Sequence, residues 1–464
     1  MRSKTLILGL SALLLGGCTL MPKYHRPESP VPATLPASAA TRAGSPTTPL
    51  ATDLGWREFF TDTRLRSVIE LALANNRDLQ IAALNVDKVR AAYRIQRASL
   101  LPSLAASAGA DNYRVPDQMS DNGPYEVAQY SIQGSVSWEI DLFGRLRSLR
   151  KKALNQYFAT DQARAATQMS LVAAVAEGYL ALVADQENLR LSQATLDAQR
   201  ASYDLIRQSR DAGVASDLTL RQSQSQVEAA RVNVAQYTGL VAIDQNALNV
   251  LAGIPVPADL LPTGLDAVGE VKDVSAGLTS EILLRRPDIL AAEYQLKGAN
   301  ASIGAARAAF FPRISLTAAA GIIAPDVSTI FDAGSGAWSF KPQVVQPIFA
   351  GGSLVAGLKV AKVDRQIAVA QYEKAIQVAF REVSDALVRR ATLVEQLDAQ
   401  QALVNALDES YRLADARYKE GVDNYLGVLV SQRSLFDAQR GLVATRLARR
   451  ANQIALFKVL GGGV

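Results

Sequence analysis

The sequence predicts an internally duplicated, mixed α+β membrane protein in which strand hairpins alternate with long helical hairpins. Three observations predict this class. Residues 73–104 reappear in phase at 283–314. A hydrophobic repeat of seven residues runs through long segments without proline, and it predicts helices that pack as coiled coils. Between these segments the period changes to two, which predicts strands with one apolar and one polar face.

The duplication can be followed along the whole chain. Near the start of each copy, matching residues lie 210 positions apart: Asp78 and Asp288, Arg97 and Arg307, Pro102 and Pro312. Farther on, matching residues lie 208 positions apart: Tyr203 and Tyr411, Gly213 and Gly421, Gly253 and Gly461. A period of this length is far too long for a solenoid repeat, so it indicates that a unit of domain size has been duplicated.

The N-terminus has the form of a secretory leader that ends in a lipid-attachment signal. Arg2 and Lys4 precede an apolar run at 6–15, which is too short to span a bilayer as a helix. The run ends in Leu-Gly-Gly-Cys18, which resembles the lipobox of bacterial lipoproteins, in which the cysteine is acylated and becomes the first mature residue. Cys18 is the only cysteine in 464 residues, which excludes an intramolecular disulfide. An ordinary cleavage site beside an incidental cysteine is the alternative. Thr19 follows, and a non-acidic residue there implies sorting to the outer membrane.

Residues 22–50 contain seven prolines among Ser, Thr and Ala, and they predict an extended tether rather than a packed element. The chain carries 49 Lys and Arg against 44 Asp and Glu, and two of the basic residues lie in the leader. A balanced and interspersed charge gives no indication of a nucleic-acid partner. The most apolar stretch after the leader, 171–184, is interrupted by Glu177, so a membrane crossing by the mature chain would have to use strands.

Long helical hairpins are predicted at 144–253 and 351–460. In the first, apolar residues recur every seven positions: Val175, Leu182, Leu189, Leu196 and Tyr203 before Gly213, and Val227, Val234, Val241 and Leu248 after it. The second copy repeats most of this pattern. One uninterrupted helix over 144–212 would be about 100 Å long at 1.5 Å per residue. A rod that spans distance is the favoured interpretation, and a broken helix or a partner-binding coiled coil is the alternative.

Shorter helices are expected before each strand hairpin, at 62–76 and 77–100 in the first copy and at 278–285 and 287–310 in the second. Pro102 and Pro312 end these helices, because proline cannot continue a helix and favours extended geometry in the residue before it.

The strand hairpins are expected at about 103–142 and about 313–348. Apolar residues alternate with small or polar ones along one strand of each hairpin: Tyr130, Ile132, Val136, Trp138, Ile140 and Leu142, and Ile314, Leu316, Ala318, Ala320 and Ile322. The partner strands, 104–111 and 338–348, alternate less regularly, and polar loops at 112–126 and 323–337 join the pairs. Two soluble hairpins packed on a core are the alternative. The lipid anchor, the long helices and the duplication favour membrane strands.

Four strands are too few to close a barrel, because single-chain membrane barrels begin at about eight strands. The chain must therefore oligomerise. A dimer would supply eight strands and a trimer twelve, and only twelve leave room for a wide pore.

These patterns divide the chain into five expected parts. They are a lipoprotein signal peptide at 1–17, a lipidated N-terminus and proline-rich tether at 18–55, repeat 1 at 56–253, a linker at 254–277 and repeat 2 at 278–464.

Several motifs together resemble the outer membrane factors of tripartite efflux systems. They are the lipobox ending at Cys18, Trp-Arg-Glu-Phe-Phe at 56–60, Glu-Ile-Asp-Leu-Phe-Gly-Arg at 139–145, Arg-Arg-Pro-Asp-Ile at 285–289, Ile-Gly-Ala-Ala-Arg-Ala-Ala-Phe-Phe-Pro at 303–312 and Gly-Val-Asp-Asn-Tyr-Leu at 421–426. The resemblance runs from Cys18 to the C-terminal glycines. Within that family, the chain is similar to the lipoprotein branch that serves multidrug pumps of the resistance-nodulation-division (RND) type.

The resemblance implies a homotrimer with a 12-stranded outer-membrane β-barrel, continued by a long α-helical coiled-coil tunnel through the periplasm that is closed at its inner tip. The implied partners are a periplasmic adaptor protein, an inner-membrane RND-type transporter and outer membrane lipid. In this interpretation the chain is lipid-anchored in the outer membrane and catalyses nothing. It is a gated passive conduit that exports drugs or other toxic small molecules.

The gate is expected at the tips of the helical hairpins. Gly213 and Gly421 each follow a long helix and precede Val, as expected for left-handed helix caps. Asp217 and Asp423 are either N-caps of the return helices or gate residues. The resemblance places the constriction on the second tip, where Val422 and Leu426 match its positions and Asp423 would add a ring of charge. Relatives often carry an acidic residue at the position of Val430, so an apolar constriction is favoured here.

Bonds between helices are expected to hold the gate shut. The candidate residues are Tyr418 and Arg417 on one tip and Arg210 and Asp217 on the other. Solvated surface charges are the alternative, since such charges contribute little when they are exposed. If the bonds hold the gate, replacing Asp423 or Tyr418 with Ala raises the conductance in planar bilayers.

Three rival functions remain at this point. A non-conducting structural envelope lipoprotein would explain the heptads and the anchor but not the alternating strands. A conduit for heavy-metal efflux or for type I secretion would have the same architecture. An enzyme is not supported, because catalytic motifs are missing and the only histidine, His25, lies in the tether. We therefore expect no catalytic residues, no metal site and no cofactor except the covalent lipid on Cys18, and the exported substrates are not determined.

Overall fold

The computed structural model of the chain describes residues 19–35, 51, 54–119, 123–262, 264, 269, 271–272 and 279–462. The chain forms two compact units. Unit 1 contains residues up to 28, 85–161 and 291–372, and unit 2 contains 29–84, 162–290 and 373–464. Each unit takes corresponding segments from both copies, so neither copy forms a unit by itself.

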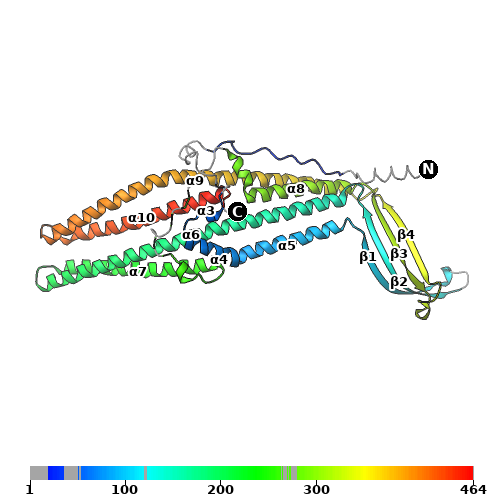
Figure 1. The fold of residues 1–464 in the computed structure, drawn as a ribbon, viewed down its shortest axis with the longest axis horizontal. Helices are drawn as coiled ribbons and strands as arrows, with labels where there is room; N and C mark the ends of the chain where they lie inside the picture. Colours follow the sequence, from blue (N-terminus) through cyan, green and yellow to red (C-terminus); the bar gives the residue numbers. More distant parts are fainter. Residues whose placement is uncertain are drawn as a thin grey trace. The chain divides into compact units, whose positions relative to one another are not determined.

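Unit 1 contains a four-stranded antiparallel sheet in the order β1-β2-β3-β4 (Figure 1). Its strands are β1 (Ser103–Val115), β2 (Tyr125–Ile140), β3 (Arg313–Ala324) and β4 (Gly336–Val345). The central contact joins the two copies, because β2 of the first copy pairs with β3 of the second.

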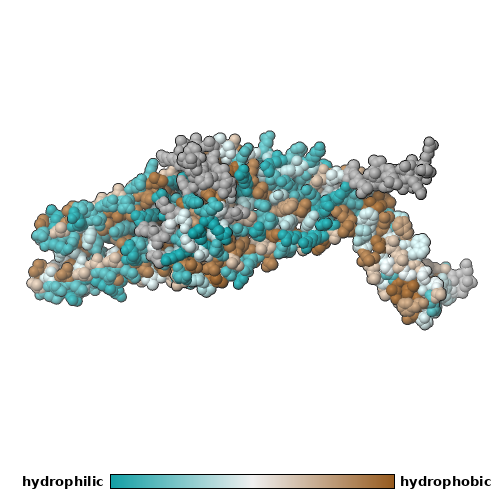
Figure 2. Space-filling model, in the orientation of Figure 1, coloured by the Kyte–Doolittle hydropathy of each residue, from teal (hydrophilic) through white to brown (hydrophobic). Residues whose placement is uncertain are grey.

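The register of the sheet sorts side chains by polarity. Val136 lies opposite Leu104 on one side and Ala318 on the other, and Ala318 lies opposite Phe340. One position along, an equivalent row consists of small, polar or charged residues: Ser103, Ser137, Thr317 and Lys341. Because side chains alternate between faces with a period of two, one face of the sheet is apolar and the other is polar. Figure 2 shows apolar and weakly polar residues over the sheet, whereas polar residues predominate over the helices.

The strands differ from the sequence expectation at their loop ends. β1 and β2 extend into the segment 112–126 that was expected as a polar loop, and the connections contain the short 3₁₀ turns η2 (Asp117–Met119) and η6 (Val327–Thr329). Met119, Val327 and Phe331 are exposed in these connections, so the loops are not uniformly polar.

Two long helices follow the two strand hairpins. They are α6 (Arg145–Asp211) and α9 (Ser353–Lys419), each of 67 residues, and each begins in unit 1 and continues into unit 2. Neither helix is broken, and 67 residues correspond to about 100 Å. The start of α6 is fixed by Asp141, whose carboxylate accepts hydrogen bonds from the backbone N–H groups of Leu146 and Arg147 at 3.0 and 2.8 Å. The shorter helices α5 (Arg77–Ala98) and α8 (Pro287–Ala308) precede the strands.

Unit 2 is built around the return helices α7 (Asp217–Ala252) and α10 (Tyr425–Val459), with α3 (Trp56–Phe59), α4 (Thr63–Asn75) and the turn η3 (Ala258–Leu260). Phe59 stacks on Phe457 with ring centroids 3.9 Å apart, and Ile69, Leu182 and Leu248 are fully buried. The heptad positions Leu182 and Leu248 thus pack in the core, where the seven-residue repeat predicts them.

The expected helix at 278–285 forms a 3₁₀ turn, η5 (Ser280–Arg285), instead of an α-helix. Pro287 is the physical reason, because it forces Arg286 into extended geometry (φ −64°, ψ 136°) before α8 begins. The Arg286 side chain then binds Asp288 and Glu382 at 2.8 and 2.9 Å.

One window of α6 is apolar and long enough to cross a membrane by composition alone, contrary to the expectation that no stretch after the leader qualifies. That window is 56% buried within the protein. Its apolar character is therefore explained by packing in the core.

Candidate functional site

The tips of both helical hairpins are closed by the same backbone motif. At the end of α6, Gly213 has φ +78°, its N–H donates to the carbonyl of Arg210, and the next N–H donates to the carbonyl of Ser209 at 2.8 Å. At the end of α9, Gly421 has φ +69°, and its N–H donates to the carbonyl of Tyr418. This is the Schellman arrangement, which requires a left-handed residue and therefore favours glycine.

The return helices are not capped by the aspartates that the sequence suggested. The N-cap of α7 is Ser216, whose hydroxyl accepts the N–H of Thr219, and the N-cap of α10 is Asn424, whose side chain accepts the N–H of Leu426. The N-cap interpretation of Asp217 and Asp423 is therefore wrong: each lies one residue away from the cap.

Both aspartates instead form ion pairs across their own tips. Arg210 Nε lies 2.9 Å from Asp217 Oδ1, and Arg417 Nε lies 2.5 Å from Asp423 Oδ2. The hydrogen bond from Arg417 lowers the pKa of Asp423 below its usual range. Each pair joins the end of one long helix to the start of its return helix. In the described part of the chain, these pairs stay within a hairpin and do not link the two hairpins.

The two hairpins are linked by an apolar cluster, which we call the tip cluster. Its buried members come from α6, α7 and α10: Ile206, Leu220, Tyr425, Val428 and Leu429. Half-buried residues pack around them, among them Tyr203 and the site candidate Tyr418. The rings of Tyr418 and Tyr425 lie 5.1 Å apart within the second hairpin, and Tyr418 packs against the cluster that also contains Ile206 and Leu220 of the first hairpin.

Three of the predicted gate residues form an exposed apolar stripe. Val422, Leu426 and Val430 follow each other at intervals of four and expose 60%, 52% and 47% of their surface. Leu426 and Val430 share one side of the start of α10, and Val422 lies in the tip turn that precedes this helix. In the first copy Val214 and Leu218 are also exposed, but the stripe ends there because the next position is Gln222.

Cys18 lies outside the described residues, but the segment that follows it is well placed. Residues 19–28, which we call the strap, run along α8 in unit 1. Arg307 donates to the carbonyl of Leu20 at 3.2 Å, and Asn300 donates to the carbonyl of Pro22 at 2.8 Å. A Cβ at Gly304 would lie 2.9 Å from Met21 Cα, so glycine permits this approach. The strap is extended, as expected, but it is packed rather than free.

A charged latch holds the strap. The carboxylate of Glu293, whose side chain is only 4% exposed, accepts two hydrogen bonds from Arg26 at 2.9 and 3.0 Å and one from the Tyr24 hydroxyl at 3.0 Å. Lys297 Nζ lies 3.1 Å from the same carboxylate. Burial alone would raise the pKa of Glu293, but the hydrogen bonds from Arg26, Lys297 and Tyr24 outweigh it, and the pKa lies below its usual value.

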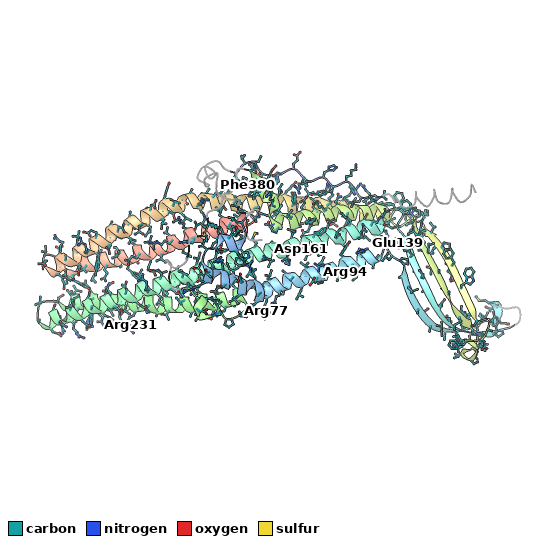
Figure 3. All side chains as sticks on the ribbon, viewed as in Figure 1. Arg77, Arg94, Glu139, Asp161, Arg231 and Phe380 are labelled. Atoms are coloured by element: carbon teal, nitrogen blue, oxygen red, sulfur yellow. The ribbon has the colours of Figure 1, made fainter. Side chains whose placement is uncertain are left out.

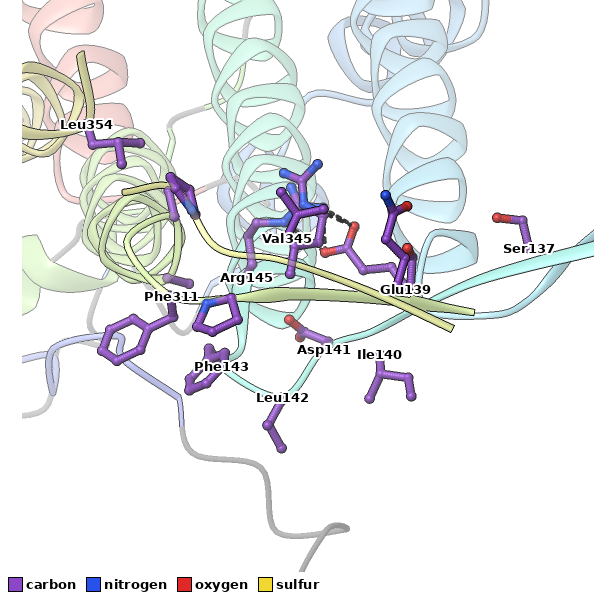
Figure 4. Close-up of a pocket in the computed structure, with 17 residues that line it drawn as sticks. Ser137, Glu139, Ile140, Asp141, Leu142, Phe143, Arg145, Phe311, Val345 and Leu354 are labelled. Carbon is purple, nitrogen blue, oxygen red and sulfur yellow. Dashed lines mark hydrogen bonds and ion pairs between the residues drawn. The ribbon is translucent and has the colours of Figure 1, made fainter. Parts of the chain in front are cut away.

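A cavity of about 610 Å³ lies where the sheet meets the helices of unit 1 (Figure 4). Glu139 at the base of β2, labelled in Figure 3, points into it and binds Arg145 at 2.8 Å, while Arg313 lies 3.7 Å away. The phenyl rings of Phe143 and Phe311 stack beside it with centroids 4.7 Å apart.

Comparison with known proteins identifies the family. The profile of the outer membrane efflux protein family matches residues 68–254 and again residues 278–462, once in each copy. The chain belongs to the outer membrane efflux protein family. It is 49% identical to the probable efflux pump outer membrane protein TtgC of Pseudomonas putida, over 100% of this chain and 96% of TtgC. It is 41% identical to the outer membrane protein OprJ of Pseudomonas aeruginosa, over 98% of this chain and 95% of OprJ.

Solved structures agree with this assignment. The open state of the MtrE outer membrane channel of Neisseria gonorrhoeae superposes with a TM-score of 0.87 at 38% identity, over 96% of this chain and 98% of that one. The expectations of an outer membrane location and of a role as an efflux channel are thus confirmed. The family consists of conduits rather than enzymes, so the prediction that the chain is not an enzyme is confirmed too. The structural lipoprotein alternative is excluded.

Sequence reasoning missed the latch and most of the tip cluster of this efflux protein. A signal for the latch was present, because Glu293, Lys297, Asn300, Gly304 and Arg307 fall at intervals of four and three on one face of α8. It was not recognised because the partner segment lies more than 260 residues away in the sequence.

Proposed function

We propose that three copies of this efflux protein join their sheets into one 12-stranded barrel through the outer membrane, and that the helical hairpins continue the barrel as a periplasmic tunnel. The register of the sheet carries this proposal. It collects apolar residues on one face, suited to lipid, and polar residues on the other, suited to a water-filled pore. β1 and β4 are the edge strands, and an open edge is not stable in a bilayer.

Disulfide trapping tests the assembly. Ser339→Cys in β4 is combined with Ser107→Cys in β1. A second double variant combines Ser339→Cys with Ala105→Cys and samples the neighbouring register between β4 and β1. Intramolecular bonding is disfavoured because two strands separate these positions. We expect oxidation of a matched pair to give a covalent species of three chains, whereas either single variant stays monomeric on denaturing gels. A ladder that stops at two chains would contradict the trimer.

We also propose that Cys18 carries the lipid anchor. The strap supports this, because its Leu20 lies beside Arg307 at the end of α8, and β3 begins at Arg313. An acyl chain on the preceding residue would start near the base of the sheet. Metabolic labelling with palmitate should modify the wild type but not Cys18→Ala. Equal labelling of both would refute the anchor.

The exported compounds are proposed to be toxic small molecules. Relatives at 44–49% identity are named antibiotic, toluene and solvent efflux pump outer membrane proteins. These names favour drug or solvent export over metal efflux or type I secretion. We propose that a periplasmic adaptor and an inner-membrane RND-type transporter complete the pump. Expression in a strain without its own channel should restore tolerance to toluene and antibiotics but not to copper or silver, and the adaptor should co-purify.

The second hairpin tip is proposed as the gate. The exposed stripe Val422, Leu426 and Val430 supports an apolar constriction, which blocks ions because water leaves a narrow apolar passage. The ion pair of Arg417 with Asp423 and the packing of Tyr418 would hold the tip in place. The duplication offers a matched control, since the pair of Arg210 with Asp217 is the equivalent in the first copy.

Single-channel conductance separates these roles. We expect Asp423→Ala and Tyr418→Ala to raise the conductance, and Asp217→Ala to raise it less. Leu426→Ser should also raise it, because a hydroxyl favours wetting. If the variants of both copies behave alike, the second tip has no special role in gating. If none differs from the wild type, the tips are not the gate.

A further inference from the structure

We propose that the first turns of α6 bind the headgroups of anionic phospholipids in the inner leaflet of the outer membrane. The surface consists of the basic side chains of residues 145–152, which we call the basic run. Five of these eight residues are Lys or Arg. The inference rests on the proposed barrel, because the barrel determines where the bilayer ends.

The basic run begins where the apolar face of the sheet ends. Ile140 is the last residue of β2, and α6 starts at Arg145. Phe143 lies between these two residues in the sequence, and its ring stacks on the ring of Phe311 with centroids 4.7 Å apart. Aromatic residues gather at the interfaces of membrane barrels, so this pair marks the level at which hydrocarbon gives way to headgroups. Arg150 lies about 7.5 Å farther along the helix than its first residue, within reach of headgroup phosphates for long side chains.

The positive charge of the basic run is only partly neutralised within the chain. Its first two arginines are paired, with Glu139 and Asp141. In the part of the chain that the structure describes, no ion pair engages the last three basic residues: Arg150, Lys151 and Lys152. α6 has no acidic residue in its first turn, and a helix N-terminus itself carries partial positive charge. Asp141 already compensates the N-terminus of α6, so the positive charge left over is that of Arg150, Lys151 and Lys152 in the second turn, and an anion from outside the chain can neutralise it.

Part of the basic run lies on the same side of unit 1 as the strap. Lys151 and Phe158 are seven residues apart, so they share one face of α6. Phe158 contacts Tyr294 at a centroid distance of 5.2 Å. Lys297 Nζ lies over the ring of Tyr294 at 4.9 Å and over that of Tyr24 in the strap at 5.2 Å. A Cβ at Gly304 of α8 would lie 2.6 Å from Ser148 Oγ in the basic run and 2.9 Å from Met21 Cα in the strap, so the basic run and the start of the strap lie at the same level of α8. The proposed acyl anchor precedes the strap and therefore faces the same leaflet as the basic run.

A phospholipid surface fits this arrangement better than a soluble anion does. Clusters of basic residues beside a membrane segment are typical of proteins that bind anionic lipids, and an acyl anchor combined with a polybasic patch gives firmer attachment than either alone. Each Lys or Arg near an anionic bilayer strengthens binding about fivefold. Three unpaired cations therefore predict a preference of roughly 100-fold for an anionic over a zwitterionic bilayer surface, and of about fivefold for a single anionic lipid that pairs with one cation.

Native mass spectrometry of the lipidated protein in a neutral detergent measures this preference, with phosphatidylglycerol and phosphatidylcholine as probes. The triple variant Arg150→Gln, Lys151→Gln, Lys152→Gln should lose about fivefold or more in affinity for phosphatidylglycerol and keep its weak affinity for phosphatidylcholine. The matched control neutralises three arginines elsewhere: Arg200→Gln, Arg207→Gln, Arg221→Gln. These three arginines lie in unit 2, outside the basic run, so this control should bind as the wild type does.

A charge-conserving variant, Arg150→Lys, Lys151→Arg, Lys152→Arg, should retain binding. Equal affinity of the wild type for both lipids, or unchanged affinity in the triple variant, overturns the proposal. Displacement of bound lipid by millimolar glycerol phosphate would assign the surface to a soluble anion and overturn the lipid assignment. If the triple Gln variant loses the trimer while the wild type and the charge-conserving variant keep it, the basic run bridges copies of the chain instead of binding lipid. A wild type that forms no trimer at all would refute the proposed barrel. This result is distinguishable from failure of lipid binding because the oligomeric state is measured before lipid is added.

Discussion

The latch between the strap and α8 predicts how firmly the N-terminus is held. In Arg26→Ala, the buried carboxylate of Glu293 loses two charge-assisted hydrogen bonds of 2.9 and 3.0 Å but keeps those from Tyr24 and Lys297. A hydrogen bond to a charged group contributes about 1.5–3 kcal/mol, and the Arg26 side chain is 48% exposed, which reduces its contribution. We expect a loss of about 2 kcal/mol, equivalent to roughly 30-fold faster opening.

Hydrogen exchange of the amides at 20–28 in the intact protein measures this opening. The matched control is Arg57→Ala, because Arg57 pairs with Glu70 at 3.1 Å while both side chains are more than half exposed. We expect the control to leave exchange of the strap unchanged. A change of less than about threefold in Arg26→Ala would refute the role of the latch.

The latch should also respond to acid. The pKa of Glu293 lies below its usual value in the folded protein. The latch is therefore fully formed at pH values above the usual carboxyl pKa, and it weakens as the pH falls through the pKa that Glu293 has in the folded protein. Protection of the strap, corrected for intrinsic exchange rates, should therefore drop at acid pH in the wild type. Glu293→Gln should show lower protection at neutral pH and little further change in acid.

Three further predictions concern stability. Burial and the neighbouring carboxylate of Asp185 raise the pKa of Asp244, so the folded chain binds its proton more tightly than the unfolded chain and unfolding becomes easier as the pH rises. Asp244→Asn should remove this slope in urea titrations, and an unchanged slope would contradict the assignment. Arg286→Met should lower the unfolding free energy by about 2 kcal/mol, because it removes a buried cation that binds two carboxylates and the Val459 carbonyl, whereas Arg286→Lys should lose less. Gly253→Ala should lower the unfolding free energy more than Gly213→Ala does. Both glycines have positive φ, but only at Gly253 would a Cβ lie 2.4 Å from the Asn75 carbonyl oxygen. Gly213→Ala should lower it by about 1 kcal/mol, and equal thermal shifts of the two variants would contradict the clash.

Local patterns were enough to predict most of the secondary structure. The alternation at Ile132, Val136 and Trp138 predicts a strand with one apolar face, and the structure has β2 there. The proline-free heptads predict the long helices, and Gly213 and Gly421 predict their left-handed ends. These features depend on the period of the side chains and on allowed backbone angles, which act over a few residues.

Local patterns failed where two groups compete for one role or where distant segments meet. Asp217 and Ser216 are both good N-caps, and only the backbone geometry of the tip decided for Ser216. Tyr425 gave no periodic signal, yet it is a buried member of the tip cluster, to which both hairpins contribute residues. The 3₁₀ turn at 280–285 was missed because the restriction imposed by Pro287 outweighs helix propensity over so short a segment.

By itself, the sequence determined the duplication, the strand and helix periods and the resemblance to efflux channels, because each is encoded in neighbouring residues or in long matching stretches. The lipobox at Cys18 stays a prediction. Only the tertiary structure decided that β2 pairs with β3 in a register that unites the apolar residues of four strands. It also decided that the strap is packed on α8 through Glu293, and that Arg417 pairs with Asp423 within its own tip. The physical reason is that β2–β3 pairing and the Arg26–Glu293 contact depend on how segments far apart in the chain approach each other. The pair of Arg417 with Asp423 depends on how the backbone turns at the tip, and the period of the side chains records neither.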